Sequence, residues 1–153
     1  MKKQKITPFL WFDGKAEEAM NFYVSIFGNS KVGKLMQGPD GSVMGVSFQL
    51  EGQQFSALNG GPRYKFTPAI SLFVDCKTQQ EVDELWAKLS AGGETSRCGW
   101  LKDKYGLSWQ IIPSVLGKLL QDKDRAKAGK VMQAMMQMDK IDIKRLKQAY
   151  GRA

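Results

Sequence analysis

The sequence contains no histidine, and this absence removes the commonest general base and the most frequent zinc ligand. Nucleophilic sites that pair serine or cysteine with histidine are excluded for the same reason. No apolar run approaches the roughly 18–20 residues that cross a bilayer, so we expect no membrane segment. The chain has only two cysteines, Cys76 and Cys98, which is too few for a disulfide framework.

Two interpretations of these cysteines are open. Both thiols can be buried side chains that pack as small apolar groups. Alternatively, Cys98 can be reactive, which requires a nearby base or cation that stabilises its thiolate. Arg97 is the only local candidate for that cation.

Nucleotide-binding motifs are missing as well. The sequence has no G-x-x-x-x-G-K-[ST] phosphate loop, and no G-x-G-x-x-G opens a helix after a strand. A dinucleotide site or a Rossmann-type S-adenosylmethionine site therefore has no signature here. The glycine-rich stretch at 59–61 follows a strand without opening a helix, which favours a linker. We expect no cofactor.

What the sequence does have is an ordinary globular composition and an excess of positive charge. The 153 residues are 42% hydrophobic and 25% charged, which predicts one folded domain over 1–153. The net charge is +8, and basic residues gather after Pro113. Such charge attracts polyanions, but it is also typical of a solvated helical face. Without a nucleic-acid-binding motif, we favour the solvated face, no specific nucleic acid partner and a cytoplasmic protein.

The first half of the chain predicts the order strand, helix, strand, strand, strand. The apolar run Ile6–Phe12 has the length of a strand and ends at an Asp-Gly pair. Apolar residues then recur at helical spacing between Ala16 and Phe27. Three further strands are expected at about 31–37, 44–50 and 54–59, and the middle one alternates with a period of two.

The second half repeats this order. A strand is expected at 69–75, and Thr78 with Glu81 forms a capping box that opens a helix. Short strands follow near 94–98 and 100–102, and a last strand at 107–112 is stopped by Pro113. Asp103 lies in the turn before that last strand and is expected to shape the turn rather than to catalyse.

The chain therefore predicts an α+β fold with two similar modules, at 6–59 and 69–112, followed by a C-terminal helical extension at 114–150. A strand–helix–hairpin module has one apolar sheet face that it cannot bury alone, so two modules can close around a shared interior. The extension is rich in methionine, and we expect these side chains to fill a core or a dimer interface rather than a cofactor box.

Two stretches carry a resemblance to a known superfamily. F-D-G-K-A-E-E-A-M-N-F-Y (12–23), followed by I-F-G (26–28), resembles the opening of the vicinal oxygen chelate superfamily, which includes glyoxalase I and bleomycin-resistance proteins. C-G-W-L-K-D-K-Y-G-L-S-W-Q-I-I-P (98–113) is more specific. It resembles the PhnB-like branch, often labelled 3-demethylubiquinone-9 3-methyltransferase, as does the tail A-M-M-Q-M-D-K-I-D-I (134–143).

The resemblance implies paired β-α-β-β-β modules that form a cupped mixed sheet, usually within a homodimer. It also implies metal ligands at four pocket-facing strand positions in the metal-dependent members. In this sequence those positions fall at Thr7 or Pro8, Ser56, Ala69 and Gln110, none of which is His, Asp or Glu. A lone amide is a poor ligand set for a divalent cation, so we expect no metal.

Strand alternation then suggests which side chains line a pocket. Ser108, Gln110 and Ile112 share one face, and an inward Gln110 brings Ser108 with it and places Ser71 opposite, on the face of Phe73. Further wall candidates are Ser56, Trp11, Trp100, Phe48, Phe55 and Tyr105. Such an apolar aromatic cup suits a neutral or weakly polar organic ligand. Alternatively, these aromatic side chains fill the core.

Three functions remain open. The first is a metal-free protein that binds a small organic molecule. The second is an isomerase, lyase or transferase that uses Gln110, Ser108 or Cys98. The third is an interaction module that acts through the basic, methionine-rich tail.

Overall fold

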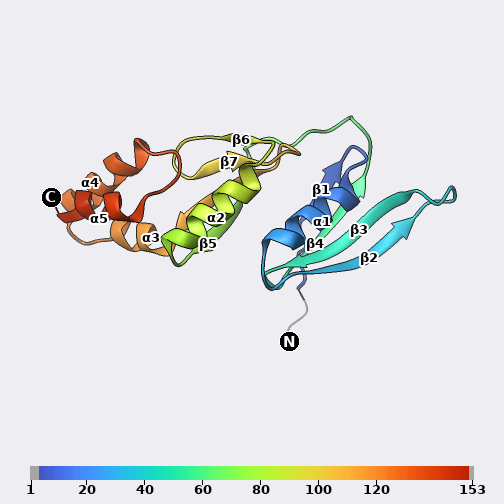
Figure 1. The fold of residues 1–153 in the computed structure, drawn as a ribbon, viewed down its shortest axis with the longest axis horizontal. Coiled ribbons are helices and arrows are strands. Elements are labelled where there is room, and N and C mark those ends of the chain that lie inside the picture. The colour runs from blue at the N-terminus through green and yellow to red at the C-terminus, as the bar shows by residue number, and fades with distance from the viewer. Residues whose placement is uncertain (1–3, 152–153) are drawn as a thin grey trace. The chain divides into compact units, whose positions relative to one another are not determined.

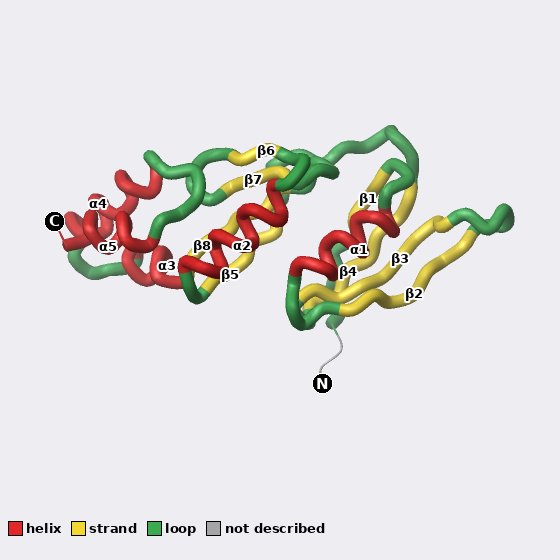
Figure 2. The backbone as a smooth tube through the Cα atoms, viewed as in Figure 1, coloured by secondary structure: helices red, strands yellow, loops and turns green. Residues whose placement is uncertain are grey.

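The computed structural model describes residues 4–151 and has an α+β fold of two compact units, which are divided along the chain between Phe66 and Thr67 (Figure 1). The division falls in the loop that follows the predicted linker at 59–61. In each unit, a helix covers one face of a four-stranded mixed sheet (Figure 2).

The first unit consists of β1 (Phe9–Phe12), α1 (Ala16–Ile26), β2 (Lys31–Gln37), β3 (Val43–Leu50) and β4 (Gln53–Asn59). We call its sheet sheet A, with the strand order β1-β4-β3-β2. The first and fourth strands are parallel, and the other pairs are antiparallel.

The second unit repeats this topology with β5 (Leu72–Cys76), α2 (Gln79–Ser90), β6 (Glu94–Thr95), β7 (Trp100–Lys102) and β8 (Ser108–Pro113). Its sheet, sheet B, has the order β5-β8-β7-β6, and again only the outer strand β5 runs parallel to its neighbour. The repeated strand–helix–three-strand order predicted from the sequence is confirmed.

The clearest differences from the predicted element boundaries concern four strands, β1, β5, β6 and β8. The strands β1 and β5 begin three residues later than expected, at Phe9 and Leu72. The strand predicted at 94–98 has only two residues, and Cys98 cannot belong to it, because Cys98 and Gly99 have positive φ angles of 61° and 83° and leave the extended conformation. Pro113 does not stop β8 but is its last residue, since a proline at a strand end gives up only its own N–H.

The covering helix of each unit packs on a continuous apolar sheet face. In the first unit, the buried Tyr23 of α1 lies 6.3 Å from Phe48, which stacks on Phe55 at 5.4 Å between ring centroids. In the second unit, α2 contacts β8, and its buried Val82, Leu85 and Leu89 face the strand residues that alternate with Gln110: Leu107, Trp109 and Ile111.

Local polar contacts cap the N-terminus of α2 and stabilise the turn between β7 and β8. The Thr78 hydroxyl accepts a hydrogen bond from the Glu81 N–H, and the Glu81 carboxylate accepts one from the N–H of Lys77, as a capping box requires. The buried Asp103 carboxylate accepts hydrogen bonds from the Tyr105 and Leu107 N–H groups and from Trp109 Nε1 at 2.9 Å. The prediction that Asp103 shapes its turn is confirmed.

The C-terminal extension folds as three helices, α3 (Ser114–Leu120), α4 (Arg125–Met136) and α5 (Ile143–Gly151). Their shared core contains one residue of β8 and five of the extension: Ile112, Leu116, Val131, Met138, Ile141 and Leu146. Met138 is therefore a core residue, as expected, whereas Met132 and Met136 are exposed. None of the helices within 4–151 combines the length and apolar character that crossing a membrane requires.

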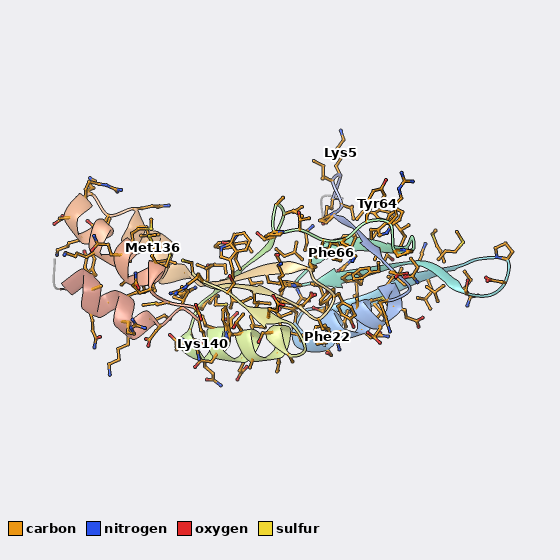
Figure 3. All side chains as sticks on the ribbon, turned by 90° about the horizontal axis from the view of Figure 1, so that it is seen from above. Lys5, Phe22, Tyr64, Phe66, Met136 and Lys140 are labelled. Atoms are coloured by element: carbon orange, nitrogen blue, oxygen red, sulfur yellow. The ribbon has the colours of Figure 1, made fainter. Side chains whose placement is uncertain are left out.

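Polar contacts join the extension to the rest of the second unit. Gln79 of α2 donates to the carbonyl of Ile141 at 2.9 Å and accepts from the N–H of Ile143 at 2.8 Å. Lys140, labelled in Figure 3 beside α2, places its Nζ 3.0 Å from Asp83 Oδ1. On the other side, the N–H of Cys98 donates to the Met138 carbonyl at 2.8 Å.

Two parts of the fold prediction stay predictions. One is the single domain over 1–153, of which residues 1–3 and 152–153 lie outside the described range. The other is the joining of both sheets around one shared cup.

Candidate functional site

A pocket of about 330 Å³ lies in the second unit, where the open face of sheet B meets the C-terminal extension. This face is the one opposite α2. The strands contribute Phe73, Asp75, Trp100, Gln110, Ile112 and Pro113. Helices α3 and α4 contribute Ser114, Leu116, Gly117, Leu120 and Met135, and Cys98 completes the lining. The pocket is thus built by a sheet face on one side and by short helices on the other.

Strand register explains why the aromatic and amide side chains meet here. Gln110 pairs with Phe73 on β5 and with Trp100 on β7, so all three lie in one row across sheet B and point to the same face. Gln110 Nε2 donates a hydrogen bond to Ser71 Oγ at 3.0 Å. The amide is therefore held in place between two aromatic side chains.

One residue of the lining, Asp75, carries a charge. It lies two residues after Phe73 on the same face of β5 and pairs with Ile112. The Ser114 hydroxyl donates to Asp75 Oδ1 at 2.8 Å. Among the described residues, no lysine or arginine lines the pocket. The chain as a whole nevertheless has a net charge of +8.

Several of the predicted site residues are brought together by this geometry. Gln110, Phe73 and Trp100 line the pocket, and Ser71 contacts Gln110. Cys98, the thiol considered for chemistry, lines it too. The placement of these side chains agrees with the alternation argument, while their role in ligand binding stays a prediction.

Ser108 lies on the same strand face as Gln110 but does not line the pocket. It is only 1% exposed, and its Oγ has no hydrogen-bond partner among the described residues. Tyr105 belongs to the turn before β8 and also lies outside the pocket lining.

Phe48 and Phe55 require a correction, because they are core residues rather than pocket walls. Phe48 is 1% exposed and Phe55 6%, and both lie on the face of sheet A that α1 covers. The period of two places Phe48 and Phe55 on the same face but does not say which face the helix covers. For these two aromatic residues, the core alternative is the one that the structure supports.

Trp11 and Ser56 lie on the other face of sheet A, in the first unit. Trp11 Nε1 donates to the Gly61 carbonyl at 2.9 Å, and its ring meets that of Tyr64 edge-on at 4.9 Å. A Cβ at position 60 would fall 2.3 Å from the Trp11 ring, so Gly60 lies flat against it. Trp11 is therefore contacted by its own following loop.

Sequence reasoning missed part of the pocket. Asp75 could have been found from its i, i+2 relation to Phe73, because both must share a strand face. Leu116, Gly117, Leu120 and Met135 carried no comparable signal, since their approach to sheet B depends on how the helices pack.

The two cysteines have different environments. Cys76 is fully buried, and this burial, with smaller contributions from nearby Glu81 and Asp75, raises the pKa of its thiol to about 12. It is therefore an inert core residue. Arg97, the cation considered for Cys98, has its Nε 3.8 Å from Asp139 Oδ1.

Comparison with known proteins gives the family. The model of the 3-demethylubiquinone-9 3-methyltransferase family matches residues 4–112. The chain belongs to this family. A structure described as a putative 3-demethylubiquinone-9 3-methyltransferase, PhnB protein, from Bacillus cereus is 40% identical, with a TM-score of 0.68; the match covers 72% of this chain and 100% of that one. The PhnB-like resemblance is thus confirmed. A comparison with curated proteins gives no match.

More distant structures share the fold. Protein PA1353 from Pseudomonas aeruginosa is 17% identical over 72% of this chain and 98% of that chain, with a TM-score of 0.62. The fosfomycin resistance protein FosX from Listeria monocytogenes, complexed with Mn(II) and sulfate, is 16% identical over 71% and 90%, with a TM-score of 0.53. At these identities the likenesses show a shared fold.

The metal of the FosX complex can be tested against the side chains of this chain. At the positions implied by the superfamily, the Ala69 side chain has no donor atom, and Gln110 offers only a neutral amide oxygen. Residues 4–151 contain no group of three or more His, Cys, Asp or Glu side chains that could hold a metal ion. These residues do not fit a divalent cation, which prefers carboxylate or imidazole ligands.

Proposed function

We propose that this PhnB-like protein binds a small organic molecule without a metal, in the pocket of the second unit. The observation that carries the proposal is a preformed cavity of about 330 Å³ lined mainly by apolar and aromatic side chains, with a fixed amide among them. Its size and composition match those of typical small-molecule sites. A variant of FosX, which shares the fold, is described as a complex with Mn(II) and a small dihydroxypropylphosphonic acid, so a protein of this fold can hold a small organic molecule.

Binding can be tested with 1-naphthylmethanol, a neutral aromatic alcohol small enough for the cavity, by NMR titration of the full chain. The variant Gly117→Phe should abolish saturable binding, because Gly117 lines the pocket and a Cβ there meets no atom within 4 Å. Removing a helical glycine should not reduce stability.

The matched control is Gly129→Phe on α4, a second exposed helical glycine with open space around it that is not in the pocket lining. This variant should bind as the wild type does. Equal binding by wild type and Gly117→Phe would overturn the assignment of the pocket.

The metal-free part of the proposal rests on the unsuitable donor set described above. Elemental analysis of the purified protein should find no stoichiometric divalent metal, and EDTA should leave binding of the naphthyl probe unchanged. One equivalent of manganese or zinc retained through purification would contradict it.

An enzymatic function is the alternative, and the observation that favours it is the thiol of Cys98 in the pocket lining. An isomerase, lyase or transferase of this kind would lose turnover in Cys98→Ala or Gln110→Ala with its fold intact. A binding protein would show no turnover in any variant.

The predicted homodimer has support in the first unit. Apolar side chains of sheet A are exposed on or beside its edge strand, with exposed fractions of 51% for Val32, 46% for Leu35 and 64% for Met36. Light scattering should give twice the monomer mass, and Leu35→Lys should shift it toward the monomer. A wild-type chain that is monomeric would contradict this prediction.

A further inference from the structure

We propose that the pocket selects a small apolar organic cation over a neutral or anionic molecule of the same shape. This inference rests on the proposed function and names the class of ligand for the same pocket. It follows from three features of the lining: its one charged side chain, its aromatic rings and its apolar wall.

The charged side chain is the carboxylate of Asp75. A cationic group that enters the pocket can meet this carboxylate, while a carboxylate or phosphonate ligand would meet a like charge without a lysine or arginine to balance it. The Ser114 hydroxyl, 2.8 Å from Asp75 Oδ1, holds one oxygen in place. Because the carboxylate is exposed, its attraction for a cation is modest and falls with added salt.

The aromatic side chains lie on the same face as the carboxylate. Phe73 precedes Asp75 by two residues on β5, and Trp100 pairs with Gln110 on the far side of β8. Aromatic faces attract cations through their quadrupole, and tryptophan does so most strongly. Carboxylate and ring surfaces within one pocket therefore favour the same charge on the ligand.

The opposite wall of the pocket favours a ligand that is apolar as well as cationic. Leu116, Leu120 and Met135 come from α3 and α4, which lie beyond residue 112, where the family match ends. The part of the chain that matches the family model supplies the amide, the carboxylate and the aromatic side chains of the pocket. The extension adds an aliphatic wall. A fully hydrated inorganic cation would gain nothing from this wall, whereas an amine on a hydrocarbon body would bury that body against it.

The test compares three probes with one ring system at neutral pH: 1-naphthylmethylamine, 1-naphthylmethanol and 1-naphthoate. We expect the amine to bind the full chain about tenfold more tightly than the alcohol, and the carboxylate to bind most weakly. Raising the salt concentration should narrow the difference between amine and alcohol.

The substitution Asp75→Asn isolates the carboxylate and keeps an oxygen that can accept from Ser114. It should weaken amine binding by about threefold to fivefold and change alcohol binding less than twofold. Asp13→Asn, which removes an equal charge from an exposed position in the first unit, should leave both affinities unchanged. Circular dichroism and thermal melting verify that each variant is folded.

The outcomes separate this inference from the proposed function. If the alcohol binds as tightly as the amine and Gly117→Phe abolishes both, the pocket is a binding site but the inference is wrong. If none of the probes binds, both proposals fail. If the amine is preferred but Asp75→Asn has no effect on it, the assignment of the carboxylate is overturned.

Discussion

The two β-α-β-β-β modules share one topology but use their open sheet faces differently. In the first, β2 is seven residues long and exposed throughout, and Trp11 on the open face is contacted by the following loop. In the second, β6 has only two residues, and the open face is bordered by the C-terminal helices, where the pocket forms. The difference shows that a repeated fold does not make equivalent sites, because the segment added after the repeat decides which face becomes a pocket.

This comparison implies that the second module depends on the extension and the first does not. Ile112 links the second module to the extension, because it lines the pocket and also belongs to the core that α3, α4 and α5 share. The predictions below test the dependence, from the largest expected effect to the smallest.

The substitution Leu146→Ala should have the largest effect. Leu146 is fully buried in the core of the extension, and such a truncation costs about 2–5 kcal/mol in the free energy of unfolding. Hydrogen exchange should show faster exchange in α3, α4, α5 and β8, with β3 and β4 unaffected. Equal loss of protection in β3 and β4 would contradict the claim that the first module does not depend on the extension.

Gly99→Ala should destabilise the second unit by about 2–3 kcal/mol. Its φ of 83° favours glycine, and a Cβ there would lie 2.9 Å from the Ile111 carbonyl oxygen and 2.7 Å from Ile112 Cδ1. Gly106→Ala is the matched control, with a φ of 88° but open space around it, and should cost only about 1 kcal/mol. Urea denaturation measures both; equal losses would show that the close approach of Gly99 to β8 is unimportant.

Gln79→Ala should cost about 1–2 kcal/mol, because it leaves the Ile141 carbonyl and the Ile143 N–H without their side-chain partner. Gln80→Ala, which removes only an exposed contact to Glu84, should be close to neutral. Thermal melting of both variants, with hydrogen exchange at Ile143, measures how firmly α2 holds the extension. An unchanged exchange rate in Gln79→Ala would contradict this role.

The effect that is smallest at neutral pH concerns Cys76, whose thiol changes the stability only above about pH 9. Its thiol has a pKa of about 12 in the folded protein, against an ordinary value of 9.0, so the unfolded chain loses this proton first. Stability should therefore fall as the pH rises from about 9 towards 12, and Cys76→Ala should lack this part of the fall. At pH 8, iodoacetamide should leave Cys76 of the native protein unmodified; rapid alkylation would contradict its burial.

Much of the fold could be predicted because it depends on local patterns. The capping box at Thr78, the turn at Asp103 and the alternation in β3 each lie within a few residues of sequence, and all three appear in the structure. The same alternation, together with the resemblance, placed Ser71 opposite Gln110, and the structure adds the hydrogen bond between them. The position of Phe48 was mispredicted because alternation assigns residues to two faces without showing which one a helix covers.

By itself, the sequence determined the two modules, the absence of histidine and the amide at position 110. These depend on residue identity and on periods of two and 3.6, which any strand or helix must follow. Only the tertiary structure decided that α3 and α4 border sheet B and that Phe48 is core. The physical reason is that a pocket is made by contacts between residues distant in the sequence, and these contacts follow from the packing of whole elements.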